Sequence, residues 1–393
     1  MFRFVGFIIA CAMLASCGYW PRMTATPSGS KKPVWTAPFV VGDTDRDYNG
    51  QPISNPAIVV DGQGAINVVY WAKGFGEVYF ARSTDGGRSF TPPVNVSNDA
   101  LGSDHPKVAV GPEGNIYIVW NNLLPLLPSW ALFSVSKDQG RTWSEPKNIS
   151  NNPRRDASRA NIAVDPSGTI YVVWHGIGRV IFTKSSDQGG TWTDPKPISG
   201  NHPVISVHPP SIAIDRNGRI YAAWSVIQGE PYTAYSDDGG ESFGEPIQAA
   251  DTKPSLYASI AVDAAGGLYL VWTEGSSGST EVLFARSTDG GKTFSAPLNI
   301  SNSKDISSMD PRVKVSRGGT VWVIWNEILI GNSEIFGVYS TDGGRTFSPS
   351  INISNAPGNA ALPEMTLDPE DALNLVWEHG MKRAIHFSKT VKP

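Results

Sequence analysis

The chain has 393 residues, of which 40% are hydrophobic and 17% are charged. This apolar content excludes an intrinsically disordered chain, and the length allows two or three domains or one large repeat array. The formal net charge of −4 provides no general attraction for nucleic acid, so we expect no nucleic-acid partner.

The N-terminus has the pattern of an export signal. Arg3 supplies a basic residue, and residues 4–14 form an apolar stretch too short to span a bilayer. The following Leu14-Ala15-Ser16-Cys17 resembles the bacterial lipobox, in which the cysteine is lipidated and becomes the new N-terminus. We therefore expect residues 1–16 to be a lipoprotein signal peptide. The alternative is an ordinary secretory signal that contains a cysteine.

This resemblance implies a bacterial cell-envelope protein that is held to the membrane by a lipid on Cys17. Residues 17–33 are rich in Pro, Ser, Thr and Gly and predict a flexible tether. Gly18, rather than Asp, follows the cysteine and gives no cue for inner-membrane retention. Outer-membrane or cell-surface placement is therefore the preferred hypothesis.

A repeat of about fifty residues organises the rest of the chain, residues 34–393. One octet recurs six times with the pattern Ser, any, Asp, any, Gly, any, Ser or Thr, aromatic. The six copies begin at Ser83, Ser136, Ser185, Ser236, Ser287 and Ser340. Because Gly supplies a left-handed backbone position and the carboxylate can accept backbone N–H groups, each octet predicts a tight turn.

A second unit precedes each octet and occurs seven times. It consists of a β-rich run, a tight turn and a second run that ends in Trp. The seven tryptophans are Trp71, Trp120, Trp174, Trp224, Trp272, Trp325 and Trp377. Alternating apolar residues and Gly, Pro, Asn and Asp turns predict four short strands per repeat, in the second copy near 105–110, 115–120, 130–136 and 145–150.

The missing seventh octet indicates how the repeats close. The last repeat stops near Thr390, while residues 34–40 match the stretch that follows an octet. The repeat is thus circularly permuted, and an N-terminal strand can complete the last unit. Radial stacking buries both faces of such sheets. We predict an all-β, seven-bladed β-propeller with six octets, closed by that strand.

The octet resembles the Asp-box, or BNR repeat, of sialidases and related propellers. Asp-boxes also occur in lectins, sorting receptors and assembly factors, so the resemblance implies the fold and leaves the activity open. Known sialidases have six blades and carry an Arg-Ile-Pro motif that begins an arginine triad. The matching stretch here, residues 51–58, contains no Arg.

The longer loops, between the second and third strands and between blades, define the expected functional face. In the enzymatic interpretation, an exo-sialidase-like glycoside hydrolase, Arg159 and Arg312 hold an anionic sugar. Asp104 or Asp310 would serve as the acid. Tyr257 with Glu274 would resemble the sialidase Tyr–Glu nucleophile pair.

Three further residues on this face, His175, Glu327 and His379, follow core tryptophans and are predicted to help bind substrate. In the alternative interpretations the same groups hold a glycan without chemistry, as in a lectin, or the protein is a scaffold for an envelope protein. A metal site at His175, His202 and His208 lacks a ligand-spacing motif, so we expect neither metal nor cofactor. We expect a monomer whose partner is a glycan or an envelope protein.

Overall fold

A computed structural model describes most of the repeat region. The described residues are 33–42, 53–72, 76–98, 102–122, 129–151, 156–176, 178–200, 208–226, 229–275, 279–303, 306–329, 332–355, 358–380 and 384–391. The predicted signal peptide, Cys17, almost all of the tether and His202 lie outside these ranges. Within them, no helix is long and apolar enough to cross a membrane.

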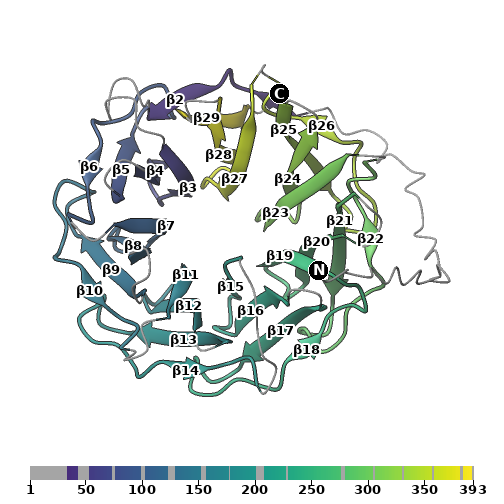
Figure 1. Ribbon diagram of the computed structural model, residues 1–393, viewed down its shortest axis with the longest axis horizontal. Helices are drawn as coiled ribbons and strands as arrows, with labels where there is room; N and C mark the ends of the chain where they lie inside the picture. The colour runs from purple at the N-terminus through teal and green to yellow at the C-terminus, as the bar shows by residue number, and fades with distance from the viewer. Residues whose placement is uncertain are drawn as a thin grey trace, which may run out of the picture.

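Seven antiparallel sheets surround a central axis, which confirms the predicted propeller (Figure 1). The innermost strands are β3 (Ile53–Val60), β7 (Ser103–Val110), β11 (Ser158–Val164), β15 (Ser211–Ile214), β19 (Ser255–Val262), β23 (Ser307–Val315) and β27 (Ala360–Leu367). The second strands are β4 (Ile66–Ala72), β8 (Ile116–Asn122), β12 (Ile170–Gly176), β16 (Ile220–Ser225), β20 (Leu268–Glu274), β24 (Val321–Leu329) and β28 (Leu373–His379).

Two more strands complete each sheet towards the outside. The third strands are β5 (Glu77–Ser83), β9 (Ala131–Ser136), β13 (Arg179–Ser185), β17 (Pro231–Ser236), β21 (Glu281–Ser287), β25 (Asn332–Ser340) and β29 (Ala384–Val391). The outer strands of the first six blades are β6 (Val94–Asn95), β10 (Lys147–Asn148), β14 (Lys196–Pro197), β18 (Ile247–Gln248), β22 (Leu298–Asn299) and β26 (Ile351–Asn352).

The N-terminal segment supplies the outer strand of the seventh blade. Strand β1 (Val34–Trp35) pairs with β29 through Val34 and Val391, and β2 (Phe39–Gly42) pairs with the same strand through Phe39 and Phe387. The two ends of the chain therefore meet in one sheet, as the permuted repeat predicts. This pairing removes the free strand edges that an open ring would expose.

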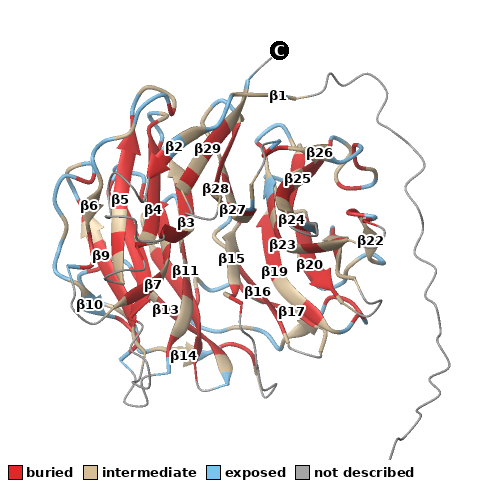
Figure 2. Ribbon diagram, turned by 45° about the horizontal axis from the view of Figure 1, so that its top comes forward, coloured by how far each residue is buried: buried red, intermediate tan, exposed pale blue. Residues whose placement is uncertain are grey.

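The second strands carry much of the core. Six of their tryptophans are fully buried, and Trp71 is partly buried. Buried residues run along the strands of each blade, and exposed residues gather at the turns (Figure 2). The apolar side chains on both faces of a blade pack against its neighbours, so each blade depends on the next.

The octets form the predicted turns between third and outer strands. In the first copy, the Asp85 carboxylate accepts hydrogen bonds from the hydroxyls of Ser83 and Ser89 and from the Ser89 backbone N–H, at 2.6 to 3.0 Å. Hydrogen bonds from side chain and backbone lower the pKa of Asp85 and of the other five octet aspartates. These carboxylates are satisfied within their own turns.

The octets also join each blade to the preceding one. Phe90 packs edge-on against Phe387 across the ring closure, with ring centroids 5.9 Å apart, and Trp143 packs against Phe80 at 5.2 Å. The octet glycine fits beneath the same ring, because a Cβ on Gly87 would lie 2.1 Å from Phe387. The octet is therefore an inter-blade contact as well as a turn.

Candidate functional site

A β-bulge recurs near the start of the innermost strands, at the end opposite the octets. In six of the seven innermost strands, the register with the second strand shifts at this point. The residue at the bulge has a positive φ, and the six residues are Asn55, His105, Arg159, Tyr257, Asp310 and Leu362. Positive φ is uncommon outside Gly, and bulges redirect side chains. Each of these six blades therefore aims one side chain at the channel mouth.

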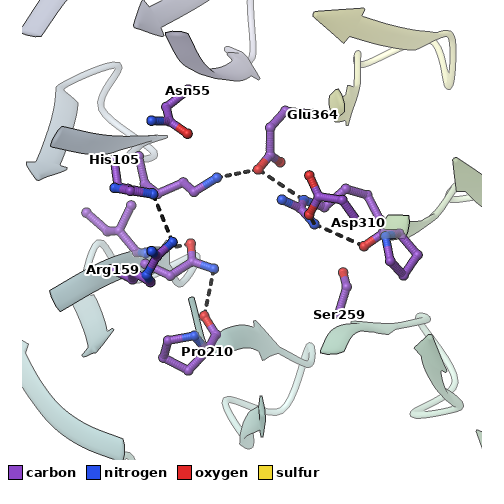
Figure 3. Close-up of polar contacts among 12 residues, drawn as sticks. Asn55, His105, Arg159, Pro210, Ser259, Asp310 and Glu364 are labelled. Atoms are coloured by element: carbon purple, nitrogen blue, oxygen red, sulfur yellow. Dashed lines mark hydrogen bonds and ion pairs between the residues drawn. The ribbon is translucent and has the colours of Figure 1, made fainter. Parts of the chain in front are cut away.

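Two rings of side chains line the channel as a result. The bulge residues form the upper ring, and the lower ring lies two residues further along each strand. Its polar members are Lys107, Asn161, Ser259, Arg312 and Glu364. Side chains from separate blades converge on the centre of the propeller (Figure 3). This convergence brings together charges that are far apart in sequence.

The upper ring encloses a cavity of about 210 Å³ at the channel mouth, hereafter the mouth cavity. Its lining is Asn55, Pro56, His105, Pro106, Lys107, Arg159, Ala160, His208, Pro209, Tyr257, Asp310, Arg312, Leu362 and Glu364. Four predicted site residues therefore share one cavity: Arg159, Tyr257, Asp310 and Arg312.

A hydrogen-bonded chain supports Arg159 on one side of the mouth cavity. Asn55 Nδ2 donates to Asp104 Oδ1 at 3.0 Å, and Asp104 Oδ2 lies 2.6 Å from His105 Nδ1. The other ring nitrogen, Nε2, lies 2.9 Å from Arg159 Nη1. Asp104 thus lies directly behind the cavity wall and fixes the imidazole that orients the guanidinium.

Arg159 has no ion pair within the described part of the chain. Its hydrogen-bonded neighbour there is the His105 imidazole. Burial lowers the pKa of Arg159, although the nearby carboxylates of Asp104 and Asp310 oppose this shift. A partly buried guanidinium without a bonded carboxylate is a favourable position for an anionic ligand.

The opposite wall holds a network of four charges. Arg312 donates through Nε to Glu364 at 3.0 Å and through Nη1 to Asp310 at 2.7 Å, while Lys107 also pairs with Glu364. Burial opposes charge on Arg312, but the two carboxylates outweigh it and raise its pKa. Burial likewise opposes charge on Glu364, yet Arg312 and Lys107 bring its pKa down to about 2. Asp310 Oδ2 is buried and has no hydrogen-bond partner among the described residues.

Tyr257 and His208 form the third side of the mouth cavity, and His175 lies against the His208 backbone. Burial, followed by the charge of Asp310, raises the pKa of Tyr257 to about 12. The His208 ring lies against Tyr257, and its pKa falls to about 3 through burial and the nearby guanidinium groups. His175 Nε2 lies 2.6 Å from the His208 carbonyl oxygen, and burial lowers the pKa of His175 to about 4. Both imidazoles are therefore neutral at pH 7.

Four other predicted site residues do not line the mouth cavity. His175, Glu274 and His379 lie at the ends of second strands, and Glu327 lies near the end of β24. The Glu327 carboxylate accepts hydrogen bonds from Ser303 and the Trp325 indole, and these bonds tie it to its own blade and the adjoining loop. Glu274 pairs across the sheet with Ser255. The roles predicted for these four residues stay predictions, because none of the four lines the mouth cavity.

The lower ring contains residues that the sequence reasoning did not assign to the site. Lys107 and Glu364 are the main examples, and each follows a proline that comes directly after the bulge residue, Pro106 and Pro363. The same X-Pro pattern recurs at the bulges of β3 and β23, and it could have indicated these channel-lining positions from the sequence.

The groups of His, Cys, Asp and Glu in the described residues include none that could hold a metal ion.

The fold and the octets define a seven-bladed Asp-box propeller. The sequence matches the BNR repeat-like domain family over residues 23–203 and 132–375, and the chain belongs to this family. A search of curated proteins finds no match.

Solved structures share the fold at low sequence identity. An ulvan lyase of a new polysaccharide lyase family is 15% identical, with a TM-score of 0.64 over 88% of this chain and 94% of that chain. A protein of unknown function from Dyadobacter fermentans is 15% identical, with a TM-score of 0.58 over 92% and 99%. A Hadza microbial sialidase is 15% identical, with a TM-score of 0.54 over 90% and 68%. Likeness at this identity shows the fold.

Proposed function

We propose that the mouth cavity binds an acidic sugar unit of a glycan, with the sugar carboxylate on Arg159. The observation that carries this proposal is the guanidinium of Arg159, which is held by His105 and has no carboxylate bonded to it in the described residues. A guanidinium presents paired donors that match a carboxylate. Binding an anion there would supply the missing counter-charge.

The remaining cavity groups fit the rest of a sugar ring. Asp310 Oδ2 is buried without a donor among the described residues, and a sugar hydroxyl would satisfy it. Tyr257 and the neutral His208 offer ring faces with polar edges on the adjacent wall. The carbohydrate-acting proteins that share this fold support the ligand class. The recessed, charged cavity favours a small acidic unit over a broad protein-docking face.

Hydrolysis of the bound glycan is a second candidate, favoured by one observation. Asp310 and Glu364 bind the same guanidinium and both line the cavity, so two carboxylates lie near one ligand position. Paired carboxylates are the usual machinery of glycoside hydrolysis. Tyr257 is a weaker candidate nucleophile, because its raised pKa keeps the phenol protonated and Glu274 does not line the cavity.

Calorimetric titration with matched sugars tests the binding proposal. An acidic oligosaccharide should bind, whereas its analogue with the carboxyl reduced to an alcohol should bind at least about tenfold more weakly, since a charged hydrogen bond is lost. Arg159→Gln should remove this preference. Arg141→Gln, in an exposed octet on the other face, is the matched control and should leave it unchanged. Equal binding of both sugars would overturn the proposal.

A fluorogenic glycoside assay separates the two candidates. Turnover that disappears in Asp310→Asn, together with retained binding, would favour hydrolysis at this site. Binding without turnover across a panel of acidic glycosides would leave a lectin-like protein.

We also propose that the propeller is anchored at the bacterial envelope by a lipid on Cys17, at the outer membrane or the cell surface. The lipobox-like sequence before Cys17 supports this placement. Membrane fractionation of Cys17→Ser should move the protein into the soluble fraction. Retention of that variant in the membrane would contradict the lipid anchor.

A further inference from the structure

A second cavity lies deeper in the channel than the mouth cavity. It has a volume of about 110 Å³ and is called here the channel cavity. The two cavities share Lys107, Arg312 and Glu364, whose ion pairs lie between them. The channel cavity has about half the volume of the mouth cavity, and we expect it to hold a small ion instead of a sugar unit.

The charge balance of the channel cavity is positive. Lys107, Arg312 and Lys314 all line it, and the carboxylate in its lining is Glu364. Even when Asp310 above Arg312 is included, three cations face two carboxylates. Lys107 and Arg312 are bonded to those carboxylates, whereas Lys314 has no ion pair among the residues with described positions. One ammonium group in the channel thus has no bonded counter-charge.

Neutral donors lie in the same wall. Ser259 Oγ accepts a hydrogen bond from Val313 N at 3.4 Å, and Ser211 Oγ accepts one from Ile260 N at 3.1 Å. Each hydroxyl hydrogen can still be donated into the cavity. The Ser259 side chain is directed towards the centre of the channel (Figure 3).

We infer that the channel cavity is a binding site for a small oxyanion, sulfate or phosphate, with Lys314 as its principal cationic contact. The anion sits beneath the ion pairs of Lys107, Glu364 and Arg312 and accepts hydrogen bonds from the serine hydroxyls. Such groups occur both as free ions and as ester substituents of glycans. The site lies below the acidic-sugar site and shares Lys107, Arg312 and Glu364 with it, but its principal contact, Lys314, does not line the mouth cavity.

Thermal unfolding and calorimetric titration of the full-length protein in detergent, at constant ionic strength, test this inference. Inorganic sulfate, inorganic phosphate and a monosaccharide sulfate ester are the probes. We expect saturable binding and a rise in the unfolding temperature with at least one probe. The ester alone would identify the source as a substituted glycan, and binding of inorganic ions would identify a free-ion site.

Lys314→Gln should weaken this binding at least about tenfold, because it removes the charged donor. Lys137→Gln, at an exposed lysine in an octet, is the matched control and should bind as the unmodified protein does. Arg159→Gln should lose acidic-sugar binding and keep oxyanion binding, so the two proposals fail separately. Absence of saturable binding with all probes, or unchanged binding in Lys314→Gln, would overturn the inference.

Discussion

Replacement of Gly87 by Ala tests whether the octet of the first blade closes the ring against the seventh. Gly87 has φ of +88°, and a Cβ there would lie 2.1 Å from the Phe387 ring. The left-handed backbone costs an L-residue about 1–2 kcal/mol, and overpacking costs about 1–3 kcal/mol more. Gly87→Ala should therefore lower the free energy of unfolding by about 2–5 kcal/mol.

Gly64 provides a control in the same blade. Its φ is +82°, and a Cβ there would have no neighbour within 4 Å. Gly64→Ala should cost the backbone strain alone, about 1–2 kcal/mol. Urea titrations followed by tryptophan fluorescence give both values, and Phe387→Leu in the Gly87→Ala background should recover part of the loss. Equal destabilisation by the two glycine substitutions would refute an interlock at the ring closure.

The charge network and the titrating groups yield further predictions. Glu364→Gln leaves Lys107 and Arg312 as neighbouring, partly buried cations and should lower the free energy of unfolding by about 3 kcal/mol. Lys107→Met in the same background should recover part of this loss in urea titrations. The pKa values of Asp138, Asp187 and Glu364 are lowered to about 2 in the folded protein, so their contribution is present above about pH 4.5 and is lost as the pH falls towards 2. Burial lowers the pKa of His175 to about 4, whereas the unfolded imidazole already binds a proton near pH 6.5. Burial lowers the pKa of His208 as well, to about 3, so both imidazoles contribute to a loss of stability that begins below pH 6.5. Thermal unfolding of His175→Gln across pH 4–7 should show a smaller loss than the unmodified protein; an identical pH profile would contradict the assignment.

The repeat architecture was predictable because its signals are local and periodic. The octet spacing, the seven tryptophans and the displaced N-terminal strand together indicate seven blades and the permuted closure. Each feature depends on residues that are close in sequence, and closure needs only a match between the two ends.

The site was predictable in part. Arg159, Tyr257, Asp310 and Arg312 reach the mouth cavity because they lie at or just after the bulges of innermost strands. Glu274 does not, since it ends a second strand and lies one layer further from the axis.

Two members of the lower ring, Lys107 and Glu364, were not assigned to the site, for a different reason. Lys107 and Glu364 sit inside strands, where a charged residue is normally interpreted as an outward-facing position. The bulge changes the register and turns these side chains towards the channel, and a register shift requires the pairing of two strands to be known.

A crystal structure of the protein with an acidic monosaccharide bound is the most direct measurement of the proposed function. The sugar carboxylate should lie within hydrogen-bond distance of the Arg159 guanidinium, with a sugar hydroxyl on Asp310 Oδ2. A carboxylate bound away from Arg159, or a sugar seated on the octet face, would contradict the account.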